Sequence, residues 1–224
     1  LAFLKEVKKM LAKDGLFVCE MNYLPMMLKN NAVDNISAEH QTYWTLRSLE
    51  NLLFRVGLQA EDVSFNDING GSFRVYIRHR SNRKPSGTVS GILAGEKRFE
   101  SLEPYQDFAK RVKEEMHKLH ATVALAVAKD HAIVDIVGSS TRGLTIVQQA
   151  GLDNKLIRCA VERNPAKVGK TYAGIPVISE EQSKASPADV YLILPYSFAP
   201  EIQKRMTWGK KFLLPLPTVR MIER

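Results

Sequence analysis

The strongest constraint on the fold is a set of four short apolar segments in the second half of the chain. They read AIVDIVG, LIRCAVE, VYLILP and KFLLPLP, and they begin at residues 132, 156, 190 and 211. Helical or loop segments separate them, which is the rhythm of β-α-β units. The sequence therefore predicts an α/β fold with a parallel, Rossmann-like sheet, whose ligands bind at the carboxyl ends of the strands.

The chain is long enough for one large domain or two small ones. It has 224 residues, of which 45% are hydrophobic and 25% are charged, so it can bury a sizeable core. Residues 79–98 are rich in Ser, Gly and basic side chains, which is typical of a linker. We predict a first domain over 1–80, a linker over 81–98 and a second domain over 99–224.

A basic cluster lies next to this expected linker, at Arg78, Arg80, Arg83 and Lys84. Such a cluster is able to bind phosphate groups, but more often it is a solvated connecting segment. Both interpretations stay open at this point.

The first 80 residues predict an incomplete α/β unit. Apolar spacing predicts helices over 1–15 and 46–57, with a buried strand, LFVCEM, after the first of them. The runs QAEDVSFND and FRVYIRH, separated by INGGS, predict an antiparallel pair at a sheet edge. Because a helix followed by a buried strand needs sheet partners, we expect the chain to be the C-terminal part of a longer protein.

Composition narrows the class of protein. No run approaches the ~18 apolar residues of a membrane helix, and no signal peptide is visible. Cys19 and Cys159 each lie in an apolar stretch, which favours a reduced cytoplasmic protein over a disulfide scaffold. The net charge of +8 suits small phosphorylated ligands as well as nucleic acid. His117 and His120 lack further ligands, so no metal site is expected.

The most informative motif is GSSTRG, from Gly138 to Gly143. A glycine turn that leaves a strand and enters a helix directs backbone N–H groups at one point, which favours an anion there. Ser139, Ser140 and Thr141 add hydroxyl groups, and the fork of Arg142 suits phosphate oxygens. The motif thus predicts phosphate binding, although a tight turn with a helix cap remains the alternative.

GSSTRG matches neither of two well-known nucleotide-binding motifs. It lacks the Lys and Ser/Thr that end a P-loop, and Ser140 replaces the middle glycine of the dinucleotide fingerprint. Glu162 lies 24 residues after Gly138, at the end of the next expected strand, where an acidic side chain can hold a ribose. A dinucleotide-dependent oxidoreductase domain therefore remains an alternative.

Six stretches in order resemble the C-terminal part of the nucleotide-sugar C-methyltransferases. They are VDNISAEHQTYWTLRSLENLL, NDINGGSFRVYI, GSSTRG, VERNPAKVGKTYAGIPVIS, LILPYSF and KKFLLPLP. The resemblance implies a C-methyltransferase that uses S-adenosylmethionine and acts on a keto-deoxy-sugar linked to a nucleoside diphosphate. It implies that residues 1–80 end a methyltransferase domain of Rossmann type, and that 99–224 form a Rossmann-like nucleotide-sugar-binding domain.

The family also has parts that this sequence does not contain. A zinc-binding domain and the acidic-Gly-x-Gly segment that cradles S-adenosylmethionine precede the region of resemblance. We therefore expect the cofactor site to lie mostly upstream and the chain alone to be inactive. The resemblance suggests neither nucleic acid nor a membrane as partner, and the sequence does not determine the oligomeric state.

The resemblance also assigns roles to individual residues. His40 matches the final histidine of the family's His-Glu-His pattern, which is regarded as the base that forms an enolate from the keto-sugar. Glu39 would orient His40 or stabilise its charged form, and Tyr43 would form a wall for the sugar. The first histidine of the pattern is replaced by Ala38, so a non-catalytic module that binds a nucleotide or a sugar nucleotide is a further alternative.

The remaining candidates would bind the nucleotide sugar. They comprise a glycine turn, the GSSTRG loop and side chains that follow the next two strands. The turn is expected to bring backbone close to the ligand, Arg74 to meet the diphosphate and Tyr196 to stack on the base. The expected residues are Gly70, Gly71, Ser72, Arg74, Ser139, Ser140, Thr141, Arg142, Gly143, Glu162, Arg163, Asn164, Lys167 and Tyr196.

Overall fold

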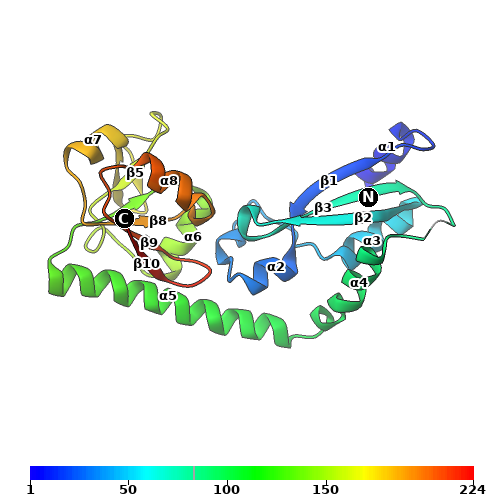
Figure 1. Cartoon of the computed structure of the whole chain (residues 1–224), viewed down its shortest axis with the longest axis horizontal. Coiled ribbons are helices and arrows are strands. Elements are labelled where there is room, and N and C mark those ends of the chain that lie inside the picture. Colours follow the sequence, from blue (N-terminus) through cyan, green and yellow to red (C-terminus); the bar gives the residue numbers. More distant parts are fainter. Residues whose placement is uncertain (83) are drawn as a thin grey trace. The chain divides into compact units, whose positions relative to one another are not determined.

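The computed structural model describes residues 1–82 and 84–224 (Figure 1). Arg83, one member of the basic cluster, lies outside the described residues. The chain divides into two compact units, and each is continuous in space but not in sequence. The first unit contains residues 1–30 and 41–107, and the second contains residues 31–40 and 108–224.

A three-stranded antiparallel sheet organises the first unit. Its strands are β1 (Phe17–Asn22), β2 (Leu58–Asn66) and β3 (Ser72–His79), and β3 lies in the middle. The antiparallel pair expected from the sequence is therefore confirmed as β2 and β3. The expectation of a buried first strand was wrong, because side chains of β1 alternate between half-buried and exposed. An antiparallel sheet covered on one face produces this alternation.

Four helices belong to the first unit. They are α1 (Ala2–Met10), α2 (Leu24–Lys29), α3 (Leu46–Val56) and α4 (Gly87–Gly95). Helix α3 begins at a capping box formed by Thr45 and Ser48 and ends at Gly57, whose φ is +75°. The buried carboxylate of Glu96 accepts hydrogen bonds from the backbone N–H groups of Leu46 and Arg47. It therefore caps the N-terminal end of α3.

Helix α4 lies where the composition predicted a linker. Its Val89 is buried, and Ile92 and Leu93 pack against the core of the first unit. Ser86 caps its first turn. Glycines and serines of the segment that suggested a linker are thus part of a short helix, with a 3-10 helix, η3 (Glu96–Glu100), after it. The packing of a few apolar side chains outweighs the weak helix propensity of Gly and Ser.

A seven-stranded sheet organises the second unit. Five parallel strands form its centre: β4 (Val134–Val137), β5 (Ala160–Glu162), β7 (Ile175–Ser179), β8 (Val190–Ile193) and β9 (Lys211–Leu214). The strand order is β10-β9-β8-β4-β5-β7-β6. The edge strands β6 (Thr171–Tyr172) and β10 (Arg220–Glu223) are antiparallel to their neighbours.

The parallel strands that the sequence predicts are all present, and the structure adds one. The four apolar segments form β4, β5, β8 and β9. The fifth parallel strand, β7, was not predicted, because Pro176 interrupts a short apolar run that follows Gly174. The fold is therefore mixed α/β with a mostly parallel sheet, and both of its edges are antiparallel.

Helices of the second unit include α6 (Thr141–Gln149), α7 (Glu180–Ala185) and α8 (Ala199–Arg205). Helix α5 spans Glu103–Asp130, and the boundary between the units falls within it. Two 3-10 helices complete the unit: η1 (Val33–Asn35) and η4 (Tyr196–Phe198).

The strand order creates a switch point between β4 and β8. The chain runs from β4 to β5 and β7 on one side, and then returns to β8 on the other side of β4. The loops after β4 and β8 therefore leave in opposite directions, which is the arrangement at which ligands bind in doubly wound sheets. The two loops lie close together, since a Cβ added to Gly138 would lie 3.1 Å from Cδ of Pro195.

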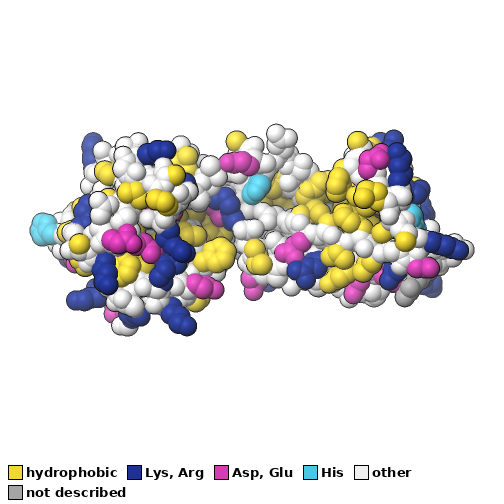
Figure 2. Space-filling model, turned by 90° about the horizontal axis from the view of Figure 1, so that it is seen from above, with side chains coloured by type: hydrophobic (Ala, Val, Ile, Leu, Met, Phe, Trp, Pro, Cys, Tyr) yellow, Lys and Arg dark blue, Asp and Glu magenta, His cyan; other side chains and the backbone are white. Residues whose placement is uncertain are grey.

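Surface properties follow the composition. On the face drawn in Figure 2, Lys and Arg side chains are dispersed and have acidic side chains between them. Among the helices that the structure describes, none is long and apolar enough to cross a membrane.

Candidate functional site at the carboxyl edge of the parallel sheet

The GSSTRG turn lies where the sequence predicted it, between β4 and α6. Gly138 follows the strand with a φ of +88°, a conformation that favours glycine. The Ser140 hydroxyl oxygen accepts a hydrogen bond from the backbone N–H of Gly143, at 3.1 Å, and so caps the helix. Gly143 is needed for close packing, because a Cβ there would lie 2.8 Å from Cδ1 of Leu194 and 2.9 Å from the Tyr172 hydroxyl oxygen.

Neighbouring strands brace the turn. The Glu162 carboxylate accepts hydrogen bonds from the backbone N–H and the hydroxyl of Ser139, at 3.1 and 2.6 Å. It also accepts from the backbone N–H groups of Arg163 and Asn164. Lys167 donates from Nζ to the Ser139 carbonyl at 2.8 Å. The Glu162 carboxylate, which the sequence suggested as a ribose ligand, thus accepts its hydrogen bonds from groups of the protein itself.

These contacts also affect the protonation of Glu162. Burial by itself would raise the pKa of this carboxyl group, but the hydrogen bonds from Ser139, Asn164 and Arg163 outweigh it, and the pKa is lowered. The carboxylate therefore stays ionised and keeps the turn in place at neutral pH.

Arg142 and Tyr196 converge on a carboxylate that the sequence did not single out. The Arg142 guanidinium forms an ion pair with Asp34, whose side chain is 5% exposed. The hydroxyl of Tyr196, in η4 after β8, donates to the other carboxylate oxygen of Asp34 at 3.0 Å. Burial raises the pKa of Asp34, while Arg142 and Tyr196 act against that shift. Asp34 therefore lies beside the segments that follow β4 and β8.

Asp34 belongs to a segment, residues 31–40, that is part of the second unit although it is distant in sequence from the rest of that unit. Near its start, the Asn31 side chain accepts from Nε of Arg111 and donates to the Pro217 carbonyl, both at 3.0 Å. Further on, Thr145 of α6 donates from its hydroxyl to the Ile36 carbonyl at 3.2 Å. The segment is therefore attached to the second unit along most of its length.

Glu39 and His40 end this segment. Hydrogen bonds from the Glu39 backbone N–H and from the side chains of Ser37 and Thr141 lower the pKa of the exposed Glu39 carboxyl group. Nδ1 of the half-buried His40 lies 2.7 Å from the Asn35 carbonyl oxygen. A carbonyl oxygen only accepts, so Nδ1 carries the proton in the neutral imidazole and Nε2 keeps its lone pair. In this tautomer Nε2 is the ring nitrogen that is able to accept a proton.

The other predicted residues lie in the first unit. The glycine turn between β2 and β3 is filled by the protein itself, since a Cβ on Gly71 would lie 2.3 Å from Cβ of Met26. The buried Ser72 donates from its hydroxyl to the Ile68 carbonyl. Arg74 forms an ion pair with Glu20 at 2.7 Å. Packing thus explains Gly71 without a ligand, and Gly70 accepts from a side-chain amide through its carbonyl.

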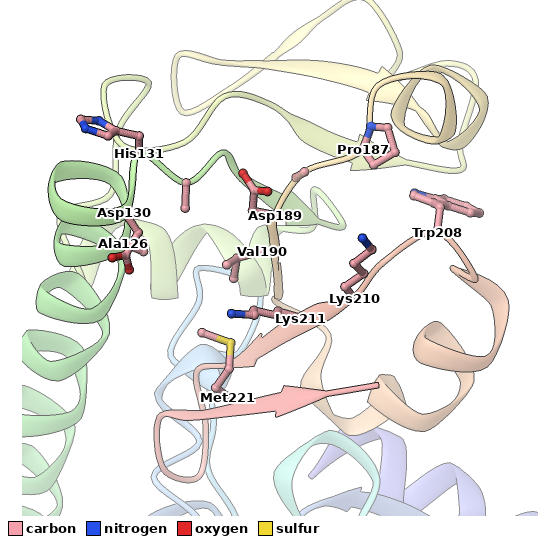
Figure 3. Close-up of a pocket in the computed structure, with 12 residues that line it drawn as sticks. Ala126, Asp130, His131, Pro187, Asp189, Val190, Trp208, Lys210, Lys211 and Met221 are labelled. Atoms are coloured by element: carbon pink, nitrogen blue, oxygen red, sulfur yellow. The ribbon is translucent and has the colours of Figure 1, made fainter.

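Two pockets lie at opposite ends of the parallel sheet. One, of about 620 Å³, opens at the carboxyl ends of β5 and β7 and is lined by Glu162, Arg163, Pro165, Val168, Ser179, Glu180 and Glu181. The other, of about 720 Å³, lies at the amino ends of β4, β8 and β9 (Figure 3). Its lining mixes Asp130 and Asp189 with Lys210 and Lys211. The first pocket adjoins the predicted ligand residues Arg163 and Glu162.

No group of three or more His, Cys, Asp or Glu side chains able to hold a metal occurs over residues 1–82 and 84–224. His120 instead contacts the Ala150 carbonyl at 2.9 Å. The two cysteines are free thiols, and burial raises the pKa of Cys19 to about 11 and that of Cys159 to about 12.

Comparison with known proteins decides the family. Residues 67–217 match the family described as "C-methyltransferase C-terminal domain". The chain belongs to the C-methyltransferase family. It is 34% identical over 231 residues to the C-methyltransferase NovU of Streptomyces niveus, in an alignment that covers 98% of this chain and 54% of that protein. The chain thus spans about half the length of this C-methyltransferase.

Asp34 is a residue of the candidate site that sequence reasoning missed. Its position in the motif DNISAEH was visible, six residues before His40. Its partner Arg142 lies 108 residues away, however, and no local pattern links the two. An acidic residue six positions before a candidate base was the signal that the sequence offered.

Proposed function

We propose that the chain is the C-terminal part of a C-methyltransferase that depends on S-adenosylmethionine and methylates a keto-deoxy-sugar linked to a nucleoside diphosphate. Membership of the C-methyltransferase family supports the reaction class. The observation that carries the proposal is His40 itself, whose Nδ1 is committed to the Asn35 carbonyl and whose Nε2 is left as a proton acceptor.

The chemistry assigned to this chain is proton abstraction beside a ketone. Nε2 of His40 takes the proton from the carbon adjacent to the carbonyl, and the electron pair of the broken C–H bond moves to form the enolate. Nδ1–H, hydrogen bonded to a carbonyl oxygen, stabilises the imidazolium that results. The negative charge of Glu39, the residue directly before His40, adds to this stabilisation. The enolate carbon is the nucleophile that accepts the methyl group.

The described residues do not fit a cradle for S-adenosylmethionine. The glycine turn of the first unit is occupied by Met26, as its contact with Gly71 shows. We therefore assign the cofactor to the half of the complete enzyme that this chain does not cover, and derive no step through it.

The nucleotide sugar is assigned to the carboxyl edge of the parallel sheet. Ser140 and Thr141 are exposed there, as are Arg163 and Asn164 at the end of β5. Backbone N–H groups and hydroxyls at the start of α6 suit phosphate oxygens, and Arg163 offers a guanidinium fork beside the pocket at β5 and β7. These four residues are the candidate ligands at this edge of the sheet that the structure leaves exposed to solvent.

The test is deuterium loss from the carbon beside the ketone, followed in the complete enzyme with a non-reactive cofactor analogue. His40→Ala should slow this exchange by about 10²–10⁴-fold, the usual contribution of a positioned base. Nucleotide-sugar affinity should stay nearly unchanged, because the imidazole is not among the proposed phosphate ligands. Glu39→Gln should slow exchange less, since the base remains.

A matched control is His120→Ala, which removes an exposed histidine from α5. It should leave the exchange rate of the complete enzyme unchanged. An exchange rate that is the same in wild type and His40→Ala would show that His40 is not the base.

A further inference from the structure

In this chain, Asp34 lies at the place where many α/β proteins bind their ligand. At the switch point between β4 and β8, Asp34 accepts from Arg142 in the first turn of α6, after β4, and from Tyr196 of η4, after β8. We call Asp34, Arg142 and Tyr196 the Asp34 cluster. Because ligands of doubly wound sheets bind at such a switch point, the cluster decides what Arg142 is able to bind.

We propose that the Asp34 cluster positions the Glu39–His40 pair for proton transfer, and that Arg142 is a positioning residue instead of a diphosphate ligand. This inference rests on the proposed function of His40 as the base. It adds that the second unit contributes to proton transfer, because its side chains position Glu39 and His40.

The first turns of α6 hold the segment at successive points. Arg142 binds the side chain of Asp34, Thr141 binds the carboxylate of Glu39, and Thr145 binds the carbonyl of Ile36. Residues 141 and 145 lie one helical turn apart, on one face of the helix. A rigid helix therefore fixes the segment both before and at the Glu39–His40 pair.

Within the segment, the backbone transmits this constraint to the imidazole. Asn35, which follows Asp34, is fully buried, and its carbonyl accepts from Nδ1 of His40. The His40 backbone N–H in turn donates to the Ser37 carbonyl at 3.0 Å. The ring orientation of His40 thus depends on the position of the residue next to Asp34.

Electrostatics argue against diphosphate at Arg142. The guanidinium already faces a carboxylate that is 5% exposed, so a diphosphate there would lie beside a second anion. Like charges at such a distance repel in a poorly solvated site. Breaking the ion pair would leave Asp34 buried without its cation, which is costly. Arg142 is therefore better suited to hold the segment 31–40 than to bind a diphosphate.

The kinetic test separates positioning from binding. In the complete enzyme, Arg142→Gln and Asp34→Asn should each slow deuterium loss at saturating nucleotide sugar on the order of 10²-fold, the usual effect of a misplaced reacting group. The KM for the nucleotide sugar should change by less than about threefold. Arg142→Lys should restore part of the rate, because it keeps the charge but not the fork. A raised KM with an unchanged maximal rate would overturn the proposal and make Arg142 a diphosphate ligand.

The double variant Asp34→Asn/Arg142→Gln tests whether the two residues act together. Its rate should fall no further than that of either single variant, within about threefold, because one ion pair is lost in all three. Multiplied losses would overturn the proposal. Arg220→Gln, which removes an equal charge from the exposed edge strand β10, is the control and should leave the rate and the KM unchanged.

Amide hydrogen exchange supplies a readout that needs no catalysis. Arg142→Gln and Asp34→Asn should increase exchange at Ile36, Ser37 and His40 by a larger factor than at the amides of β4. Unchanged protection of the segment, or an equal loss throughout the unit, would overturn the proposal. A His40→Ala enzyme that keeps its deuterium-loss rate contradicts the base assignment alone, since protection of these amides is measured separately.

Discussion

At the scale of single residues, this protein fixes protonation states through hydrogen bonds of defined direction. His40 faces a carbonyl, which sets its neutral tautomer, whereas Glu162 faces only donors, which lowers its pKa. The same rule explains the lowered pKa of the exposed Glu39 carboxyl group, since its hydrogen-bond partners are its own N–H and two side chains. The lowered pKa values of Glu39 and Glu162 and the tautomer of His40 therefore follow from local hydrogen-bond geometry.

Glu162 allows a test of this rule through pH. Its folded-state pKa lies below the ordinary value of 4.5, so its carboxylate stabilises the folded chain above pH 4.5, and this stabilisation is lost as the pH falls through the folded-state pKa. Glu162→Gln should destabilise the second unit at pH 7 by about 1 kcal/mol, the net value of one hydrogen bond. The difference from wild type should shrink at lower pH, as measured by urea denaturation.

An exposed glutamate of α5 serves as the control for this experiment. Glu114→Gln should change the free energy of unfolding by less than about 0.5 kcal/mol at either pH. If Glu162→Gln has the same effect at pH 7 and below pH 4, the bracing role of the carboxylate is wrong.

At the scale of elements, α6 connects the sheet to the segment that carries His40. Its N-terminus is capped by Ser140, and its first turn binds Asp34 and Glu39. Its approach to β8 depends on Gly143, which has no room for a methyl group beside Leu194 and Tyr172. The position of α6 against β8 therefore affects the position of His40, the candidate base.

Two glycines in helices form a matched pair for testing this packing. Gly91→Ala in α4 meets no atom within 4 Å and should stabilise the chain by up to about 1 kcal/mol, because alanine is the better helix former. Gly143→Ala carries the same propensity gain, but its methyl group overlaps Leu194 and Tyr172. It should destabilise the chain by about 1–3 kcal/mol, as overpacked cores do.

Thermal and urea unfolding of both variants measure the difference. Opposite signs for the two substitutions are expected. If Gly143→Ala stabilises the chain as Gly91→Ala does, then α6 has freedom to move away from β8, and its role as a fixed support is wrong.

At the scale of the whole molecule, the second unit is assembled from two stretches of sequence. Residues 31–40 belong to it although residues on both sides of them belong to the first unit. The ion pair of Asp34 and Arg142 joins the two stretches. A domain cut at the sequence-predicted linker, residues 99–224, would therefore lack one partner of its own buried ion pair.

This arrangement predicts that one substitution acts differently in two chains. In the 224-residue chain, Arg142→Gln should destabilise the second unit by about 3 kcal/mol, because it leaves a buried carboxylate unpaired. In a chain of residues 99–224, where Asp34 is absent, the same substitution should change stability by less than about 0.5 kcal/mol. Urea denaturation followed by circular dichroism measures both effects, and equal losses in the two chains would contradict the assembly described here.

The sequence by itself determined the features that depend on neighbours along the chain. Helix α3 with its glycine stop, the four apolar strands and the GSSTRG turn were predicted because periodicity and turn chemistry are local. The family was visible in the order of six motifs. The proposed role of His40 rests on that resemblance, and it stays a prediction until deuterium loss is measured.

Tertiary structure alone decided what depends on contacts between distant residues. It made a helix of the Gly- and Ser-rich segment 87–95, because Val89 packs into a core built from other elements. It added β7 despite Pro176, because β5 and β6 pair with that strand. It also brought Asp34 to Arg142 across 108 residues. A buried carboxylate requires a cation, but only the folded chain determines which cation is near enough to pair with it.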